Sequence, residues 1–391
     1  MNKKWEMKNE WGISDFENCL EKVNYTNKIQ RKDFKEQGNF PIISQEQEFV
    51  NGYWDDEKDL FRIEKPVVIF GDHTKVIKYV DFDFVLGADG VKILKTKKHI
   101  IPKYLYYYLQ NIELENLGYA RHYRLLKEKM IEYPKSLPEQ HRIVSILDEC
   151  FSAIEHSRKN VEQNLKNAKE LFESFLQGVF GSAGSPTEEN REGWIEKCLD
   201  ELGTITSSKR IYKSEYVKDG VPFYRTKEIK EISNGKPISL ELFISNARYN
   251  EIKKTFGVPQ IGDLLLSAVG TIGEIMVVDN EDEFYFKDGN IVWFKGFKSL
   301  DANYLKYALS AFVEKIKSLA IGAAYNALTI ERLNKYKVSF PKSIPEQQRI
   351  VRQLDALRTA TKKLEAIYQK KIANLDELKK SILDRAFKGE F

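Results

Sequence analysis

The chain has 391 residues, of which 42% are hydrophobic and 31% charged, so it can form two or three domains with cores of their own. Its formal net charge of +4 does not by itself imply any partner. No apolar run is long enough to span a membrane, and the N-terminal residues lack the apolar core of a signal peptide. Three widely separated cysteines, Cys19, Cys150 and Cys198, fit no metal site or disulfide framework, which favours a cytoplasmic protein.

Residues 1–133 are predicted to form a first globular domain. Strand-like runs at 66–72 (PVVIFGD) and 81–94 (DFDFVLGADGVKIL) precede a short aromatic helix at 102–111 (PKYLYYYLQN). Gly-Asp and Asp-Gly pairs mark turns beside these strands. The mixture of strands and a short helix indicates an α/β domain.

A long helix is predicted next, within residues 134–180. It opens with PKSLPEQHRIV, in which Pro138 suits a first helical turn and Ser136 can cap it. No further proline follows in this segment, and no glycine occurs before Gly178. The polar stretch 181–193 (GSAGSPTEENREG) then forms a linker.

The second half of the chain repeats this plan. Residues 194–340 contain strand-like runs such as GDLLLSAVGTIGEIMVVD and a helix in ANYLKYALSAFVEKIKSLA, and 341–391 form a second long helix. Its opening phrase, PKSIPEQQRIV, matches that of the first helix at nine of eleven positions, with an offset of 207. An internal duplication is predicted from this match and from three shorter ones: Glu17–Glu21 with Glu196–Asp200, Asp89–Gly90 with Asp288–Gly289, and Tyr104–Leu105 with Tyr304–Leu305.

Both long helices carry apolar residues every three or four positions, which is typical of a coiled-coil seam. A helix of about 40 residues is roughly 60 Å long and needs a partner for its apolar side. We expect an α+β fold, in which two α/β globular domains are separated by two long helices that pair as an antiparallel coiled coil. The predicted seam includes Ile143, Leu147, Leu171 and Phe175 in the first helix and Ile350, Leu354, Leu378 and Ile382 in the second.

The sequence offers no motif for catalysis. It contains no phosphate-binding loop, its GTIGE segment at 270–274 completes no dinucleotide fingerprint, and the Asn-Pro-Pro or Asp-Pro-Pro run of amino-methyltransferases is absent. Its five histidines form no metal-binding pair. Two alternatives stay open: a self-contained DNA methyltransferase or nuclease with a cryptic site, and a coiled-coil interaction protein that binds no DNA.

The duplicated Pro-Glu-Gln-x-Arg-Ile-Val phrase opens two long helices that end in SFLQGVFG and SILDRAFKG. This arrangement resembles the two conserved regions of type I restriction-modification specificity subunits. Residues 67–94 and 262–274 resemble the interiors of that family's two target recognition domains. The resemblance covers almost the whole chain and implies a non-catalytic subunit that reads a split, asymmetric site on double-stranded DNA, one half per domain.

The resemblance also implies partners. Two methyltransferase subunits would dock on the helices, hold S-adenosylmethionine and methylate adenine N6, and restriction subunits would use ATP and Mg²⁺, so that this chain itself holds no cofactor. The helices would then set the gap between the half-sites. One added helical turn, about 5.4 Å, corresponds to roughly one to two base pairs of about 3.4 Å each.

Reading DNA requires side chains that reach base edges and cations that hold phosphates. Each polar candidate could instead be an ordinary surface or core group. In the first domain the candidates are Gln45, Gln47, His73, Thr74, Lys75, Arg121, His122, Tyr123 and Arg124, of which the glutamines suit bidentate pairing with adenine. In the second domain they are Ser207, Ser208, Lys209, Arg210, Tyr224, Arg225, Thr226, Lys227, Ser267, Thr271, Tyr325 and Asn326.

The repeated phrase supplies a further set of polar residues. They either fix the start of each helix or present a docking face to a methyltransferase subunit, and the sequence favours neither interpretation. These residues are Glu139, Gln140 and Arg142 in the first helix and Glu346, Gln347 and Arg349 in the second.

Overall fold

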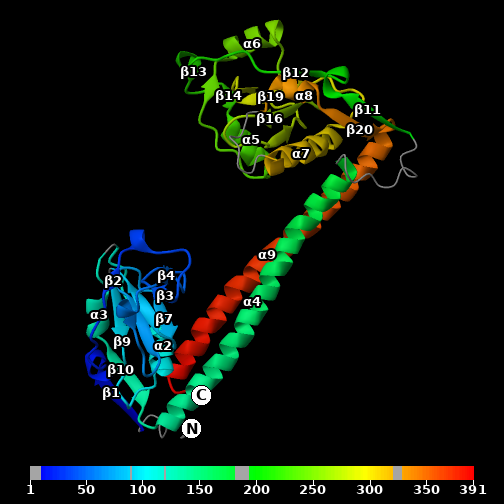
Figure 1. Cartoon of the computed structure of the whole chain (residues 1–391). Helices are drawn as coiled ribbons and strands as arrows, with labels where there is room; N and C mark the ends of the chain where they lie inside the picture. The colour runs from blue at the N-terminus through cyan, green and yellow to red at the C-terminus, as the bar shows by residue number, and fades with distance from the viewer. Residues whose placement is uncertain (1–9, 89, 119, 181–192, 320–327) are drawn as a thin grey trace, which may run out of the picture. The chain divides into compact units, whose positions relative to one another are not determined.

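The computed structural model describes residues 10–88, 90–118, 120–180, 193–319 and 328–391. Contacts divide the chain into two compact units, residues 1–163 with 368–391 and residues 164–367. Each unit combines one β-rich globular part with segments of both long helices (Figure 1). In the described part of the chain, no helix is both long enough and apolar enough to cross a membrane.

The described residues of the first unit form three sheets. One has the order β2-β8-β3-β4 with β5 added to β8, a second has the order β7-β6-β9, and β1 pairs with β10. The strands are β1 (Trp11–Asp15), β2 (Lys28–Ile29), β3 (Phe40–Ile43), β4 (Gly52–Trp54), β5 (Leu60–Phe61), β6 (Val67–Gly71), β7 (Ile77–Val80), β8 (Phe84–Gly87), β9 (Val91–Leu94) and β10 (Met130–Pro134). The helices are α2 (Pro102–Asn111), α3 (Tyr123–Lys127) and α4 (Leu137–Phe180).

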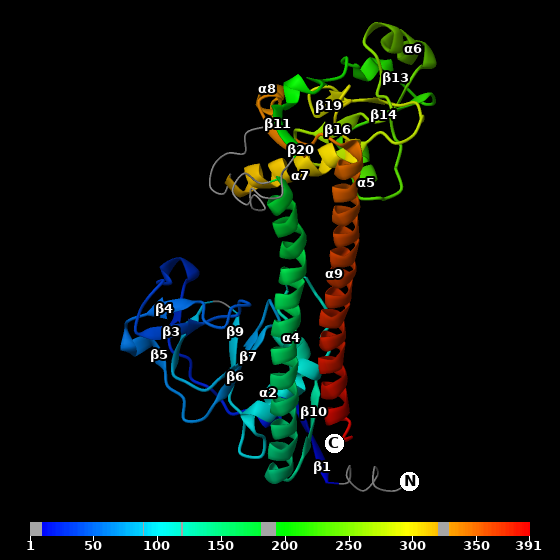
Figure 2. The same ribbon diagram turned by 90° about the vertical axis from the view of Figure 1, so that its right-hand side faces the viewer.

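Strand β6 is central to this unit because it is buried on both faces. Its side chains alternate: Val68 and Phe70 join the core under α2, whereas Val67 and Ile69 join the core shared with the five-stranded sheet. The predicted aromatic helix is α2, whose Tyr107 packs edge-on against Phe151 of α4. Figure 2 shows α2 beside the first part of α4.

In the second unit strand β16 (Leu264–Ser267) is likewise buried on both faces, since Leu264 and Leu266 lie in one core and Leu265 lies in another. The sheets of this unit have the orders β12-β19-β16-β17 and β13-β15-β14-β18, and β11 pairs with β20. The strands are β11 (Trp194–Cys198), β12 (Thr204–Thr206), β13 (Tyr216–Val217), β14 (Val221–Tyr224), β15 (Phe243–Ile244), β16 (Leu264–Ser267), β17 (Ile275–Val277), β18 (Tyr285–Phe286), β19 (Ile291–Lys295) and β20 (Lys337–Pro341). The helices are α5 (Thr226–Ser233), α6 (Asn246–Thr255), α7 (Ala302–Leu319), α8 (Ile330–Asn334) and α9 (Ile344–Phe387).

Strand registers identify which residues are equivalent in the two units. Gly71 lies opposite Val91, and Ser267 lies opposite Ile291, so the turn after β6 corresponds to the turn after β16. The hydroxyl of Tyr104 donates to the carbonyl of Glu132 at 3.0 Å, and that of Tyr304 donates to Ser339 at 2.9 Å. The tyrosine match at an offset of 200 is therefore a structural equivalence.

Two of the shorter sequence matches are wrong in register. Trp11 pairs with Pro134 and Trp194 pairs with Pro341, which places the two N-terminal strands at an offset of 183 instead of 179. The match between Glu17–Glu21 and Glu196–Asp200 is thus a coincidence of composition. The second match is off by one residue, because Asp72 N–H donates to the carbonyl of Gly90 and Ala268 N–H donates to that of Asn290.

The two long helices pair antiparallel within each unit. In the first unit Ile143 and Leu147, near the start of α4, share a core with Leu383 and Phe387, near the end of α9. In the second unit Leu176, near the end of α4, shares a core with Ile350 and Leu354, near the start of α9. Both helices begin three residues after the predicted starts, because residues 134 and 341 end strands β10 and β20.

Part of the predicted seam is shifted by one residue. Leu171, Phe175 and Leu378 are exposed, whereas Leu176 and Leu383 are buried. A strict spacing of three and four residues drifts around a straight helix, because 3.6 residues make one turn. The C-terminal end of α4 also packs against the globular part of the second unit, where Phe180 contacts Tyr304 edge-on.

Candidate DNA interface

Two of the predicted DNA-reading segments of the first unit are joined by a single residue, Asp72. Its carboxylate accepts a hydrogen bond from the backbone N–H of Tyr123 at 2.8 Å and lies 3.8 Å from the ammonium group of Lys92. Its carbonyl accepts the backbone N–H of His122 at 2.7 Å. The turn after β6 and the segment at 121–124 therefore form one surface, although 50 residues separate Asp72 from His122.

Gln45 completes this surface. Its side-chain oxygen accepts the backbone N–H of His73 at 3.1 Å, and its carbonyl accepts the hydroxyl of Thr74 at 2.5 Å. Gln47 and Thr74 are exposed, and Lys75 adopts a left-handed φ of 59° in the tight turn. Gln47, Thr74 and Lys75 also line a cavity of about 530 Å³.

His122 does not fit a base-reading role. Its ring is fully buried, and the ring Nε2 accepts a hydrogen bond from the backbone N–H of Leu117 at 3.2 Å. Tyr123 is partly buried and packs against Phe16 and Phe70, and burial raises the pKa of its hydroxyl to about 12. Arg121 and Arg124 remain exposed, so they keep the phosphate-binding potential of this segment.

In the second unit, residues 207–210 lie against the strand and turn at 285–289. Ser208 donates to the carbonyl of Phe286 at 2.8 Å, and the hydroxyl of Tyr285 accepts the backbone N–H of Lys209 at 2.7 Å. The ring of Phe256 lies 4.6 Å from the ammonium of Lys209, and Arg210 pairs with Asp288 at 2.7 Å. Ser207 accepts the backbone N–H of Gly289 at 3.2 Å.

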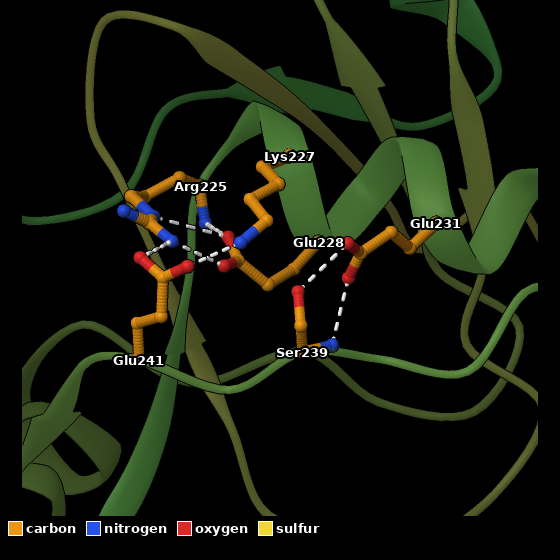
Figure 3. A network of polar contacts seen from close by, with 6 residues as sticks. All are labelled: Arg225, Lys227, Glu228, Glu231, Ser239 and Glu241. Atoms are coloured by element: carbon orange, nitrogen blue, oxygen red, sulfur yellow. Dashed lines mark hydrogen bonds and ion pairs between the residues drawn. The ribbon is translucent and has the colours of Figure 1, made fainter.

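The basic segment at 225–227 is tied to carboxylates (Figure 3). Arg225 pairs with the fully buried Glu228 at 2.6 Å and with the exposed Glu241 at 2.8 Å, and the hydrogen bond that Arg225 donates to Glu228 is the main reason that the pKa of Arg225 is raised. Lys227 pairs with the same Glu241. Glu231 anchors the loop before Glu241 because its carboxylate accepts hydrogen bonds from both the backbone N–H and the hydroxyl of Ser239, each at 2.8 Å.

The remaining DNA-reading candidates of this unit differ in burial and position. Tyr224 is buried and stacks on Phe284, so it cannot reach a base in this conformation, and Thr226 is the first residue of α5. Ser267 is fully buried and closes its own turn by donating to the carbonyl of Thr271 at 2.5 Å. Thr271 is exposed. Tyr325 and Asn326 lie outside the described residues.

The glutamines of the repeated phrase are structural. Gln140 is fully buried, donates to the carbonyls of His99 and Pro134 at 2.8 Å, and accepts the N–H of Ile101 at 2.9 Å. Gln347 makes the equivalent bonds: it donates to the carbonyls of Ser299 and Pro341 and accepts the N–H of Asp301. Ser299 and Asp301 lie 200 positions after the corresponding partners of Gln140, and Pro341 lies 207 positions after its counterpart. A docking role for these two side chains is excluded in this conformation because no part of either is accessible.

The charged residues of the phrase reach the surface instead, with the arginines exposed and the glutamates half-buried. Arg142 forms a two-pronged pair with Glu139 at 2.7 and 2.8 Å, and Arg349 forms the same pair with Glu346 at 2.7 and 2.9 Å. The hydrogen bond from each arginine lowers the pKa of its glutamate. Both helices thus present the same charged motif on their first two turns, which leaves docking as an open role for these four residues.

Sequence reasoning missed three residues that organise the interface. Asp72, Asp288 and Glu241 each hold a predicted reader or cation in place. Asp72 had a usable signal, since an acidic residue that directly follows a buried strand at a turn is well placed to bind backbone N–H groups. Glu241 had none, because its basic partners lie 14 and 16 residues away and no element period links them.

Two comparisons with known sequences identify the family. The type I restriction modification DNA specificity domain matches residues 5–163 and 191–374, once in each half. The chain therefore belongs to the family of DNA specificity subunits of type I restriction-modification systems, which are non-catalytic. A putative specificity subunit of Haemophilus influenzae is 27% identical over 350 residues, covering 87% of this chain and 85% of that protein. The EcoR124I/EcoR124II specificity subunit of Escherichia coli is 24% identical over 366 residues, covering 85% and 83%.

Solved structures share the fold. A chain from a study of complex assembly and conformational transition of the type I restriction-modification system has a TM-score of 0.71 and 17% identity, and the match covers 99% of this chain and all of that one. The specificity subunit of Thermoanaerobacter tengcongensis has a TM-score of 0.57 and 18% identity, with 98% and 97% covered. The α+β fold with paired long helices is thus that of known specificity subunits.

Proposed function

We propose that this subunit reads a bipartite, asymmetric site on double-stranded DNA. Residues 1–133 and 194–340 would act as the two target recognition domains, 134–180 and 341–391 as helical regions, and 181–193 as the linker. The exposed cations Arg121, Arg124 and Lys209 would hold phosphates, which makes binding sensitive to salt.

One observation carries this proposal: the two units place unlike side chains on equivalent scaffolds. The turn after β6 carries His73, Thr74 and Lys75, whereas the equivalent turn after β16 carries Val269, Gly270 and Thr271. Hydrogen-bonding groups specify bases, and the backbone scaffold only positions them. Equivalent scaffolds with different turns are therefore suited to reading two different half-site sequences.

The partners would be two methyltransferase subunits, one for each Glu–Arg pair at the surface of a helix start. S-adenosylmethionine would be held by the methyltransferase subunits, with adenine N6 as the methyl acceptor, and ATP with Mg²⁺ by restriction subunits. The complex would act on DNA in the cytoplasm. Repetition of the pairs Glu139–Arg142 and Glu346–Arg349 supports two similar docking surfaces.

A methylation map tests this function. DNA from cells that carry this chain with its methyltransferase is compared with DNA from cells that carry the methyltransferase alone. The expected result is a split, asymmetric methylated motif that requires the chain. A methylation pattern that is the same in both cells would contradict the proposal.

A further inference from the structure

A cavity of about 750 Å³ lies in the second unit, at one end of the paired strands β16 and β19. Asp263, directly before β16, and Lys295, the last residue of β19, belong to its lining. Ser267 lies opposite Ile291 at the other end of the pair, where the turn after β16 begins. The cavity is therefore at the end of these strands opposite to the turn that reads DNA in the proposed function.

Three lysines give the cavity a positive charge. Lys253, Lys295 and Lys298 line it, and each ammonium group can donate three hydrogen bonds. Lys253 pairs with Glu283 at 2.8 Å, and the ammonium of Lys295 lies 4.6 Å from the centre of the Trp293 ring. Within the described part of the chain, neither Lys295 nor Lys298 forms an ion pair with a carboxylate. Two cations of the lining thus have no carboxylate in direct contact.

The carboxylate of Asp263 does not fill this role. It is nearly buried, and one of its oxygens accepts the backbone N–H of Gln260 and the indole N–H of Trp293, both at 2.9 Å. Burial raises the pKa of this carboxyl group, because the charged form loses hydration. Asp263 is therefore engaged with the surrounding fold, and the two lysines stay available to a ligand.

The first unit holds two carboxylates at the equivalent place. In the strand registers Lys95 corresponds to Lys295, and its ammonium pairs with Glu21 at 3.3 Å and with Glu64 at 3.1 Å. The backbone N–H of Glu21 donates to the carbonyl of Lys95, and Thr204 lies opposite Lys295. Thr204 therefore occupies in the second unit the position that Glu21 occupies in the first.

The second carboxylate is replaced as well. By register, Val67 at the start of β6 corresponds to Asp263, so the residues three positions earlier, Glu64 and Gln260, also correspond. Thr204 and Gln260 both line the cavity, and neither carries a charge. The second unit has thus kept the lysine and lost both of the carboxylates that neutralise it in the first unit.

The cavity adjoins the start of α9. Leu300 lines it, and the neighbouring residues Ser299 and Asp301 are bonded to the buried Gln347 on the first turn of that helix. Arg349 is exposed two residues further along the same helix. A partner that docks at the start of α9 is therefore well placed to reach the cavity as well.

We propose that this cavity binds an aspartate or glutamate side chain of the methyltransferase subunit that docks on the second unit; this rests on the docking surfaces of the proposed function. A carboxylate is the group that the equivalent lysine holds in the first unit. A DNA phosphate fits less well, because the cavity is at the strand end away from the reading turn. Lys95 is already paired within its own unit, so this contact belongs to the second unit alone.

The test uses the DNA-free complex of the chain with its methyltransferase, which is diluted while mass photometry follows the loss of a methyltransferase subunit. Thr204→Glu combined with Gln260→Glu restores the two carboxylates of the first unit, which should repel an acidic partner. The concentration at which half of the complexes have lost one methyltransferase should rise by roughly 10-fold or more. Thr204→Gln has a side chain of the same size without the charge, so it is the matched control and should keep the wild-type value.

Lys298→Gln gives a second, independent measurement at an exposed position, where folding is not at risk, and should shift the dissociation in the same direction. Equal dissociation of the double glutamate variant and of Thr204→Gln would overturn the proposal. Weaker DNA binding by Lys298→Gln with unchanged methyltransferase dissociation would also overturn it, since the cavity would then hold a phosphate. Failure of the DNA-reading function looks different, because the wild-type complex would assemble but direct no split methylation motif.

Discussion

Asp72 and His122 are joined twice, since the carbonyl of Asp72 accepts the backbone N–H of His122 at 2.7 Å and its ring Nδ1 at 3.0 Å. The ring Nε2 accepts the backbone N–H of Leu117, so the imidazole must carry its proton on Nδ1. Two loops that face DNA in the proposed function are thus fixed to each other by a fully buried side chain.

His122→Ala should therefore free the loop that ends at residue 122. The substitution leaves the N–H of Leu117 and the carbonyl of Asp72 with one partner fewer in a buried site, which corresponds to a loss of about 2–4 kcal/mol in the free energy of unfolding. Hydrogen exchange should become faster at residues 117, 122 and 123. Arg121→Ala, at the exposed neighbouring position, should change neither quantity measurably. Slow exchange at residue 117 in the His122 variant would contradict this role.

Gln347→Ala should destabilise the second unit by about 3 kcal/mol, because the N–H of Asp301 and the carbonyls of Ser299 and Pro341 lose a buried partner. Gln348→Ala on the same helical turn removes one long, exposed contact of 3.4 Å and should change stability by less than about 0.5 kcal/mol. Urea unfolding of the two variants measures the difference. Equal stability of the two would show that the buried glutamine does not clamp the helix start.

Lys78 should make the stability of the first unit depend on pH. Burial lowers its pKa to about 8 from the ordinary 10.5, although its ammonium donates to the carbonyl of Phe49 and the side chain of Asn51. The unfolded chain binds more protons than the folded chain between these two values, so the free energy of unfolding should rise as pH increases through this window.

The expected size is about 1.4 kcal/mol per pH unit above pH 8, and about zero below it. The measurement is the difference between wild type and Lys78→Met in urea at pH 7, 8, 9 and 10, in which the titration of other groups cancels. A difference that stays constant from pH 7 to 10 would mean that Lys78 remains charged throughout.

Glu241→Gln should strengthen DNA binding by the assembled complex. Glu241 neutralises Arg225 and Lys227, and its loss leaves Lys227 available for a phosphate (Figure 3). The slope of log affinity against log salt should steepen by up to about one. Glu231→Gln alters the other anchor of the same segment without releasing a cation, so its slope should match wild type. Equal slopes in all three proteins would show that Lys227 does not meet DNA.

Arg349→Glu should weaken one methyltransferase contact while the isolated chain still folds. Arg349 is an exposed residue whose pair with Glu346 contributes little to stability, so the thermal midpoint should change by no more than a degree or two. Native mass spectrometry should show complexes with one methyltransferase subunit in place of two. Unchanged stoichiometry would count against docking at this surface.

The sequence predicted helices and strands well where the apolar residues follow a single dominant spacing. The run at 102–111 forms α2 with the predicted bounds, and the apolar run at 67–71 forms the buried strand β6. The long helices also followed from apolar spacing, whereas their antiparallel direction was inferred from the need to pair the two seams and to place two readers along one duplex. The helices and the strand themselves depend on residues that are near one another in the chain, so sequence alone carries them.

Features that depend on distant partners could not be predicted. Gln140 resembles any polar residue on a first helical turn, and only the position of residues 99 and 101 shows that it is buried. Ser267 and Tyr224 look like exposed readers in the sequence, but neighbouring strands cover them. The match between Glu17–Glu21 and Glu196–Asp200 failed because five residues of similar composition carry no register information, which only strand pairing supplies.

Exchange of one recognition domain tests the central claim most directly. Residues 1–133 are replaced by the corresponding segment of another member of the family, and the methylated motif is mapped in cells that carry the methyltransferase. Two unlike readers on one chain predict that one half of the motif changes and the other half is retained. A change in both halves, or in neither, would contradict the assignment of one DNA word to each unit.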